Sequence, residues 1–368
     1  MEQQKTIAIA ITGHFYTDQR MQRISSVLKE MNFHVLLVYR PFVKYGNVIK
    51  NTELKDMDLL AIKPLFNSGI LFYLWFNVLL FFKLLFKKID IFYAVDSDTL
   101  AAMLCLSMLK GKPLVYDAHE YFTEVPELQG KSIKKWIWHR LTLAGVKRSK
   151  LCITVSDSLA KALELRYYKP FSVIRNVPFY HQEQKVVPFH SPTIIYQGAL
   201  NKGRELELLI EAMKELPQFK LLLVGEGDLS ATLRELAQKL KLTNVEFKGI
   251  LSPNELKIIS AKCFVGYNLL DAQSLSYYYS LSNKYFDYVQ AGIPSISSHL
   301  PEYEFLNTEY GCGICIMNTK EALVETLLKC FSDEFYYNKL KENALFAAEK
   351  LNWNQESVRL KELFEPFI

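Results

Sequence analysis

One helix is predicted by the stretch Ser282-Asn-Lys-Tyr-Phe-Asp-Tyr-Val-Gln-Ala-Gly-Ile-Pro294, and it carries two charged side chains on one face. Lys284 stands three residues before Asp287, and residues at that spacing are neighbours on a helix surface. Ala291-Gly-Ile-Pro294 ends the helix, and Ser295-Ile-Ser-Ser298 follows as a short apolar strand. The stretch is therefore a helix followed by a strand.

The start of this helix suits a nucleotide-sugar diphosphate. Free N–H groups and the positive end of the helix dipole favour a phosphate there. Lys284 adds charge, and Asp287, one turn further on, can accept hydrogen bonds from a pair of sugar hydroxyls. The alternative is a surface pair of opposite charges on an ordinary helix, because such pairs are common. Spacing alone leaves both interpretations open.

Composition limits the class of protein. The chain has 368 residues, of which 50% are hydrophobic, so it can bury large cores and we expect two domains. The net charge of +5 is mild: it permits an anionic ligand or a membrane surface but does not indicate nucleic acid. Cys312-Gly-Ile-Cys315 lacks a second cysteine pair or a histidine cluster, so we expect no zinc and reduced, buried thiols. With no signal peptide before the first strand, a cytoplasmic location is expected.

Strands and helices alternate through the first half of the chain. Apolar runs predict strands, and apolar residues at helical spacing predict helices. The predicted strands are 6–11, 34–39, 91–95, 114–117, 151–155 and 171–175, and the predicted helices are 20–31, 100–109, 134–147 and 157–165.

A second alternating series follows a polar segment, 178–192, that contains three prolines and is typical of a linker. Its predicted strands are 193–197, 219–224, 245–248, 263–267 and 295–298, and its helices are 204–215, 229–240, 253–260, the Lys284 helix and two C-terminal helices. Two doubly wound α/β domains are therefore expected, at 1–180 and 190–350, with a C-terminal helix at 351–368 that packs back on the first. Ligands of such sheets bind beyond the carboxyl ends of the strands, here in the cleft between the domains.

Three loops of the second half contain glycines where predicted strands end. They are Tyr196-Gln-Gly-Ala-Leu-Asn-Lys-Gly-Arg204, Val224-Gly-Glu-Gly-Asp228 and Phe247-Lys-Gly-Ile250. Glycine lets a backbone approach a ligand closely, and Lys202 or Arg204 in the first loop could hold a phosphate. The second loop is equally compatible with a plain turn.

Together these residues resemble those of GT-B-fold retaining glycosyltransferases of family 4, the group 1 transferases. The motifs that carry the resemblance are Gly198-Ala-Leu with Arg204–Ala212, Leu223–Gly227, Val245–Gly249 and Asn283–Pro294. Asp117-Ala-His-Glu-Tyr-Phe-Thr-Glu-Val-Pro-Glu127 is similar to a segment of bacterial members that build surface polysaccharides. The resemblance implies two Rossmann-like domains that face a central cleft. It also implies retaining transfer of a sugar from a nucleotide-diphosphate sugar to a hydroxyl of a lipid-linked or polysaccharide precursor.

The resemblance also assigns donor-binding residues in the second domain. Arg204 takes the place of the basic residue that grips the diphosphate, Lys284 is a second phosphate ligand, and Asp287 binds the ribose hydroxyls. The family often has an arginine where this chain has Ala199, and an acidic residue seven positions before Asp287, where this chain has Tyr279. The donor-binding set is Gly13, Gly198, Lys202, Arg204, Gly225, Gly249, Tyr279, Ser282, Asn283, Lys284 and Asp287.

In the first domain, the resemblance assigns His119 as the catalytic residue, hydrogen-bonded to the transferred sugar. A structural hydrogen bond is the alternative for a single histidine in a loop. Gly13 would lie beside the diphosphate, and Asp18 with Arg20 resemble a family pair on the acceptor side.

The expected chemistry needs neither a metal nor a cofactor beyond the donor substrate. Arg204, Lys284 and helix N-termini can stabilise the charge that develops on the leaving diphosphate. Two other functions are compatible with this architecture. A non-hydrolysing nucleotide-sugar epimerase would need further acid and base residues around the sugar. A non-catalytic nucleotide-sugar-binding subunit is suggested by Tyr279 and Ala199.

The segment 69–88 is apolar from Ile70 to Phe82 and ends in Lys83, Lys87 and Lys88. An apolar run of this length is too short to span a bilayer, which needs about 20 residues. It predicts either an interfacial helix or one packed against the sheet. With a basic helix at 131–150, it indicates peripheral contact with the inner face of the cytoplasmic membrane, with Phe72, Trp75 and Phe76 as anchors.

Overall fold

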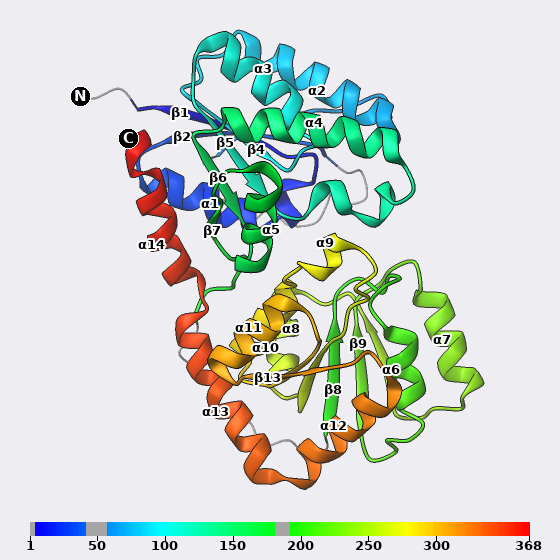
Figure 1. Ribbon diagram of the computed structural model, residues 1–368. Helices are drawn as coiled ribbons and strands as arrows, with labels where there is room; N and C mark the ends of the chain where they lie inside the picture. Colours follow the sequence, from blue (N-terminus) through cyan, green and yellow to red (C-terminus); the bar gives the residue numbers. More distant parts are fainter. Residues whose placement is uncertain (1–3, 42–56, 181–191) are drawn as a thin grey trace. The chain divides into compact units, whose positions relative to one another are not determined.

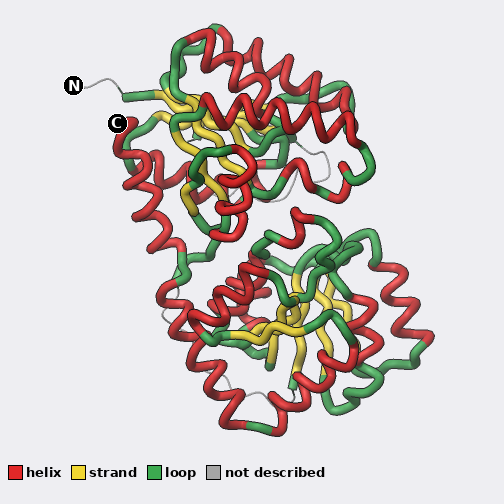
Figure 2. The backbone as a smooth tube through the Cα atoms, viewed as in Figure 1, coloured by secondary structure: helices red, strands yellow, loops and turns green. Residues whose placement is uncertain are grey.

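The computed structural model describes residues 4–41, 57–180 and 192–368. The chain forms two compact units: the first comprises 1–176 with 356–368, and the second comprises 177–355. Most of the predicted linker, 178–192, lies outside the described residues. Each unit is built on a parallel sheet with helices on both faces (Figures 1 and 2), which confirms the prediction of two doubly wound α/β domains.

The sheet of the first unit has the strand order β3-β2-β1-β4-β5-β6-β7, and its strand pairs are parallel. The strand order reverses between β1 and β4, so the loops after these two strands diverge at a switch point where such sheets bind ligands. The strands are β1 (Thr6–Ala10), β2 (His34–Tyr39), β3 (Asp58–Ala61), β4 (Ile91–Val95), β5 (Leu114–Ala118), β6 (Leu151–Thr154) and β7 (Ser172–Val173).

Helices cover both faces of this sheet. The helices α2, α3 and α4 lie side by side on one face, with α1 and α5 on the other (Figure 1). Asp18 and Ser156 begin α1 and α5 by accepting hydrogen bonds from backbone N–H groups of the first turn. The bounds are α1 (Gln19–Glu30), α2 (Gly69–Leu85), α3 (Leu100–Lys110), α4 (Ser132–Arg148) and α5 (Asp157–Tyr167).

The C-terminal helix α14 (Trp353–Phe364) ends against the first unit. The Phe364 ring is fully buried and stacks on Tyr93 of β4, with 6.2 Å between ring centroids. The Lys5 ammonium donates to the backbone carbonyls of Phe367 and Ile368. The last residues of the chain therefore complete the core of the unit that its first residues begin.

The sheet of the second unit has the order β10-β9-β8-β11-β12-β13 and reverses between β8 and β11. Its strands are β8 (Thr193–Gln197), β9 (Lys220–Val224), β10 (Val245–Gly249), β11 (Val265–Asn268), β12 (Ser295–Ser298) and β13 (Gly313–Ile316). Its helices are α6 (Leu206–Ala212), α7 (Ser230–Lys239), α8 (Pro253–Ser260), α9 (Leu275–Tyr278), α10 (Asn283–Gln290), α11 (Pro301–Tyr310), α12 (Lys320–Ser332) and α13 (Glu334–Lys350).

Close packing requires a glycine at one position of this sheet. A Cβ atom on Gly266 of β11 would lie 2.2 Å from the Tyr288 ring of α10, closer than any real Cβ contact. The missing side chain therefore lets α10, the helix predicted to bind phosphate, pack close to the sheet near the switch point.

Candidate functional site

Lys284 of α10 is a half-buried cation at the end of β8. Its ammonium lies 4.4 Å from the centre of the Tyr196 ring, and its side chain passes over Gly198. Burial lowers the pKa of Lys284 well below its usual value, and the nearby Arg204 lowers it further. In the described part of the chain, no carboxylate comes within ion-pair distance of Lys284 or Arg204. Two neighbouring cations without a counter-ion form a site suited to an anion.

Asp287, one turn further along α10, contacts a different side chain. Its carboxylate accepts a hydrogen bond of 2.7 Å from the Gln197 amide, whereas Lys284 contacts Tyr196, the preceding residue of β8. No ion pair between Lys284 and Asp287 is found among the described residues. The alternative drawn from the sequence, a surface ion pair between Lys284 and Asp287, is therefore wrong. The two charged side chains contact different residues of β8.

The predicted glycines lie at the ends of three neighbouring strands: Gly198 follows β8, Gly225 follows β9, and Gly249 is the last residue of β10. All three have positive φ angles. The Gly198 N–H donates to the carbonyl of Val224, and the Gly225 N–H donates to that of Gly249. A Cβ atom on Gly225 would lie 2.0 Å from the Gly198 carbonyl oxygen. Close packing of neighbouring loops therefore explains Gly225 without a ligand.

The remaining predicted donor residues of the second unit differ in their contacts and in their exposure. The Ser282 N–H donates to the Tyr303 hydroxyl, and its own hydroxyl donates to Asn268. Both Ser282 donors thus hold the start of α10 in place. Lys202 and Asn283 are exposed, while Tyr279 is half-buried at the end of α9, against the Tyr278 ring.

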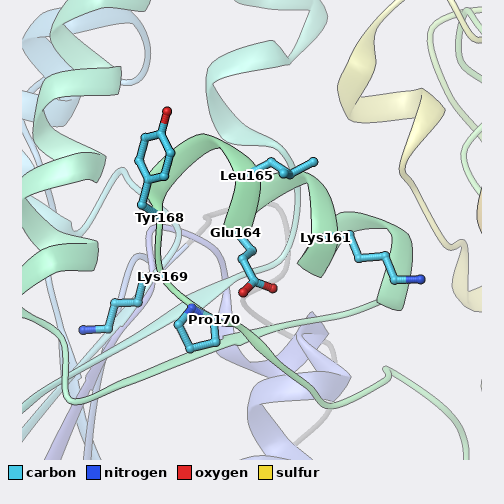
Figure 3. Close-up of a pocket in the computed structure, with 6 residues that line it drawn as sticks. All are labelled: Lys161, Glu164, Leu165, Tyr168, Lys169 and Pro170. Atoms are coloured by element: carbon cyan, nitrogen blue, oxygen red, sulfur yellow. The ribbon is translucent and has the colours of Figure 1, made fainter.

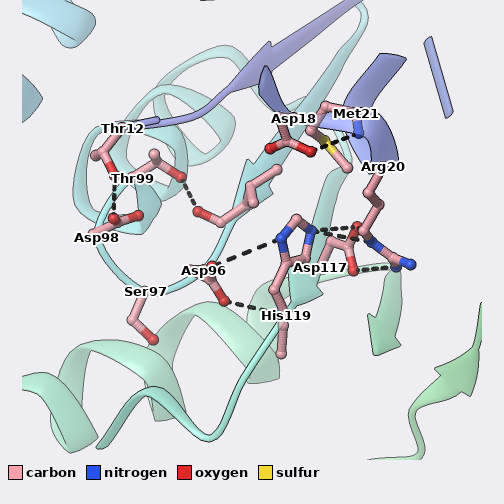
Figure 4. Close-up of polar contacts among 12 residues, drawn as sticks. Thr12, Asp18, Arg20, Met21, Asp96, Ser97, Asp98, Thr99, Asp117 and His119 are labelled. Carbon is pink, nitrogen blue, oxygen red and sulfur yellow. Dashed lines mark hydrogen bonds and ion pairs between the residues drawn. The ribbon is translucent and has the colours of Figure 1, made fainter. Parts of the chain in front are cut away.

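A buried polar network lies in the first unit (Figure 4). The Arg20 guanidinium of α1 donates to both oxygens of Asp117 on β5, at 2.8 and 3.2 Å. The Tyr93 hydroxyl donates to the same carboxylate at 2.7 Å. Arg20 and Asp117 are 2% and 0% exposed. Although burial opposes ionisation, the Arg20 charge lowers the pKa of Asp117 below its usual value.

His119, the predicted catalytic residue, lies at the edge of this network. Its Nε2 is 3.3 Å from Asp117, its Nδ1 is 4.0 Å from Asp96, and its backbone N–H donates to Asp96 at 2.8 Å. Burial opposes the charged imidazole, but the Asp117 and Asp96 carboxylates together raise the pKa of His119 to about 9. The Arg20 Nε also lies 3.1 Å from the His119 Nε2, and the ring is 22% exposed, so the imidazole is held in a fixed orientation and reaches the surface.

Two acidic residues beside His119 were missed by the sequence analysis. Asp96 and Asp98 follow β4, and burial raises the pKa of both carboxyls. The Thr12 hydroxyl, at the end of β1, donates to Asp98 (Figure 4). The signal was a polar stretch, Val95-Asp-Ser-Asp-Thr99, directly after a buried strand. Gly13 lies next to Thr12, and open space surrounds the position of its missing Cβ atom.

One surface hollow in the first unit does not coincide with these residues. It lies at the end of α5 and is lined by Lys161, Glu164, Leu165, Tyr168, Lys169 and Pro170 (Figure 3). The charged ends of Lys161 and Lys169 point in opposite directions. In the ranges that the structure describes, no group of three His, Cys, Asp or Glu side chains could hold a metal ion.

The two parallel-sheet α/β domains match solved structures of glycosyltransferases with the GT-B fold. Sucrose-phosphate synthase from Thermosynechococcus elongatus has a TM-score of 0.77, at 16% identity over 99% of each chain. HepE from Anabaena, solved with UDP, has a TM-score of 0.78, at 16% identity over 98% of this chain and 100% of its own. WaaG, a glycosyltransferase of lipopolysaccharide biosynthesis, has a TM-score of 0.74, at 16% identity over the same shares.

The family is indicated by the second half of the chain. Residues 181–345 match the model of the family described as "Glycosyl transferases group 1", which confirms the resemblance drawn from the sequence motifs. No curated protein matches the chain. The matched range contains Arg204, Lys284 and Asp287.

Proposed function

We propose that this protein is a glycosyltransferase that moves a sugar from a nucleotide-diphosphate sugar to a hydroxyl acceptor. The observation that carries the proposal is the pair of cations Lys284 and Arg204, which lack a carboxylate partner among the described residues. A diphosphate would supply the missing negative charge. The carboxylate of Asp287, one turn from Lys284, would accept hydrogen bonds from the ribose.

A uridine nucleotide is the first donor to test. HepE has been solved with UDP, with UDP and glucose, and with UDP-glucose. These structures share the fold of this chain, so they support the class of donor rather than a particular sugar.

The proposed chemistry is retaining and independent of metal. The acceptor hydroxyl attacks the anomeric carbon from the face that the diphosphate leaves, the bond to the diphosphate breaks, and the hydroxyl proton passes to the departing phosphate oxygen. Lys284 and Arg204 stabilise the charge on that leaving group. His119 would form a hydrogen bond to the transferred sugar.

Incubation with a panel of UDP, GDP, TDP and ADP sugars tests the function. We expect one donor to release its nucleoside diphosphate in the presence of an acceptor extract, with activity that survives a chelator. An epimerised donor would indicate the epimerase alternative. Binding without turnover, seen as a thermal shift for one nucleotide only, would indicate a non-catalytic subunit.

We also propose that the acceptor is presented at a membrane surface. None of the helices in residues 4–41, 57–180 and 192–368 combines the length and apolar character that crossing a membrane requires.

Helix α2 has two apolar faces, one buried and one exposed. Phe72 and Phe76 are 4% and 0% exposed and pack in the core, so their prediction as membrane anchors is wrong. Helix α2 is buried on that face.

The opposite face of α2 is exposed and apolar, with 50% or more of Ile70, Leu71, Leu74 and Phe82 accessible. Nearby α4 exposes Trp136 at 63%. Lys83, Lys87 and Lys88 are exposed at the end of α2. An apolar stripe that ends in lysines is typical of helices that lie at an anionic lipid interface.

Flotation with liposomes tests this surface. Wild-type protein should float with anionic vesicles at low salt and less so at high salt, because lysine attraction to lipid headgroups is screened. Replacing Lys83, Lys87 and Lys88 by Glu should reduce the floating fraction several-fold.

The matched control replaces three exposed lysines of the second unit, Lys214, Lys239 and Lys241, by Glu. It changes the net charge equally and should float like wild type. Equal losses in both triple variants, or wild-type protein that stays in the soluble fraction, would contradict the proposed membrane surface and favour a soluble acceptor.

A further inference from the structure

Gln197 is a buried polar residue at the end of an apolar strand. The preceding residues of β8, Ile194 to Tyr196, are at most 1% exposed, and Gln197 itself is 4% exposed. A buried amide must find hydrogen-bond partners, because leaving it unpaired costs more than an apolar side chain of the same size. Its two partners are Asp287 of α10 and Ser260 of α8.

These partners fix which way the Gln197 amide points. The carboxylate of Asp287 can only accept, so the group 2.7 Å from it must be the Gln197 NH₂. The amide oxygen then faces the Ser260 hydroxyl at 3.1 Å, and that hydroxyl shares its one hydrogen with the Leu256 carbonyl at 2.8 Å. The contacts with Asp287 and Ser260 together fix the orientation of the Gln197 amide.

The Gln197 amide orients the Asp287 carboxylate relative to the sheet. The side chain of Asp287 starts from a helix, whereas the amide that holds it starts from a strand at the switch point. A carboxylate offers about four acceptor positions on its two oxygens. The Gln197 amide occupies one of these positions and fixes the direction of the carboxylate.

We propose that Gln197 is a positioning residue that presents the Asp287 carboxylate to the ribose hydroxyls of the donor nucleotide, with Ser260 orienting Gln197. The proposal rests on the proposed function, because it takes the ligand of this site to be a nucleoside diphosphate. Gln197 acts through Asp287, so it should govern the discrimination between ribose and 2′-deoxyribose more than the affinity for the diphosphate.

Calorimetric titration with UDP and with 2′-deoxy-UDP tests the proposal. Wild-type protein should prefer UDP by about ten-fold or more, the effect of one charge-assisted hydrogen bond. Gln197→Met keeps the side-chain volume but removes the amide. We expect it to lower the preference at least three-fold, to roughly a third of the wild-type ratio, through weaker UDP binding at unchanged affinity for 2′-deoxy-UDP.

Ser260→Ala is the second variant, because it removes the orienting hydroxyl and leaves Gln197 in place. It should also lower the preference for UDP over 2′-deoxy-UDP, by a smaller factor than Gln197→Met does. It provides the test if Gln197→Met does not fold. An unchanged preference in the folded variants, or equal losses for both nucleotides, overturns the positioning role alone. If wild-type protein binds none of the nucleoside diphosphates of U, G, T and A, the proposed function fails, and the role of Gln197 fails with it.

Discussion

Replacing Lys284 by Met is expected to weaken nucleoside-diphosphate binding about ten- to hundred-fold, which corresponds to about 1.5–3 kcal/mol for a hydrogen bond to a charged group. The ammonium is half-buried beside Arg204 and has no carboxylate partner in the described ranges, so a bound diphosphate would be its counter-ion. Calorimetric titration of the wild type and the variant with UDP, or with the diphosphate that the donor panel identifies, measures the loss.

The same substitution should leave the unliganded protein as stable as the wild type, or more stable. A cation held near another cation, with a pKa lowered by burial, costs free energy that a methionine of similar length does not. Lys239→Met is the matched control, because Lys239 is an exposed lysine of α7 in the same unit. An unchanged affinity in Lys284→Met, or an equal loss in Lys239→Met, would contradict the anion site.

The alternation of strands and helices could be predicted because the central strands are short apolar runs bounded by turn residues. The strands 34–39, 91–95, 193–197 and 295–298 have the predicted bounds. Strand β3 was missed because Asp58–Ala61 is short and only partly buried at the edge of the sheet. The strand β13 and the helices α9 and α11 were also not predicted.

Helix α6 shows how one backbone angle limits prediction from sequence. The apolar spacing from Arg204 to Glu215 predicts a longer helix than the observed Leu206–Ala212. Glu205 has a φ angle of +52°, a left-handed conformation, so the helix cannot begin before Leu206. Arg204 therefore lies in the loop that precedes the helix.

The two faces of α2 could not be separated from the sequence. The helix is apolar almost all round, so its period does not reveal which side is buried. Packing against α3 selects Phe76 and Leu80 for the core and leaves Leu71 and Leu74 exposed. The helix itself, by contrast, follows directly from its composition.

The buried network around Asp117 depends on packing between elements that are distant in sequence. Arg20 comes from α1, Tyr93 from β4 and Asp117 from β5. The sequence indicated Arg20 and His119 separately, through the family resemblance. That one carboxylate joins them is a consequence of the parallel order β1-β4-β5, which places the ends of these strands next to one another.

Asp117→Asn is expected to destabilise the protein by about 3–5 kcal/mol, the usual cost of breaking a buried ion pair. The Arg20 guanidinium would stay 2% exposed without its carboxylate. Chemical denaturation followed by tryptophan fluorescence measures the change, because Trp75, Trp136 and Trp138 report on the first unit. Glu30→Gln is the matched control: it breaks the exposed Glu30–Lys361 pair, and the expected loss is below about 1 kcal/mol.

The pH dependence of stability gives this prediction a second readout. His119 has a folded-state pKa of about 9, above the value of roughly 6.5 for an unfolded histidine. Its contribution to stability is therefore complete below about pH 6.5 and is lost as the pH rises through 9. In Asp117→Asn the imidazolium loses its nearest carboxylate, so the decline in alkaline solution should become shallower. An unchanged decline, or a variant as stable as Glu30→Gln, would show that Asp117 does not hold Arg20 and His119 together.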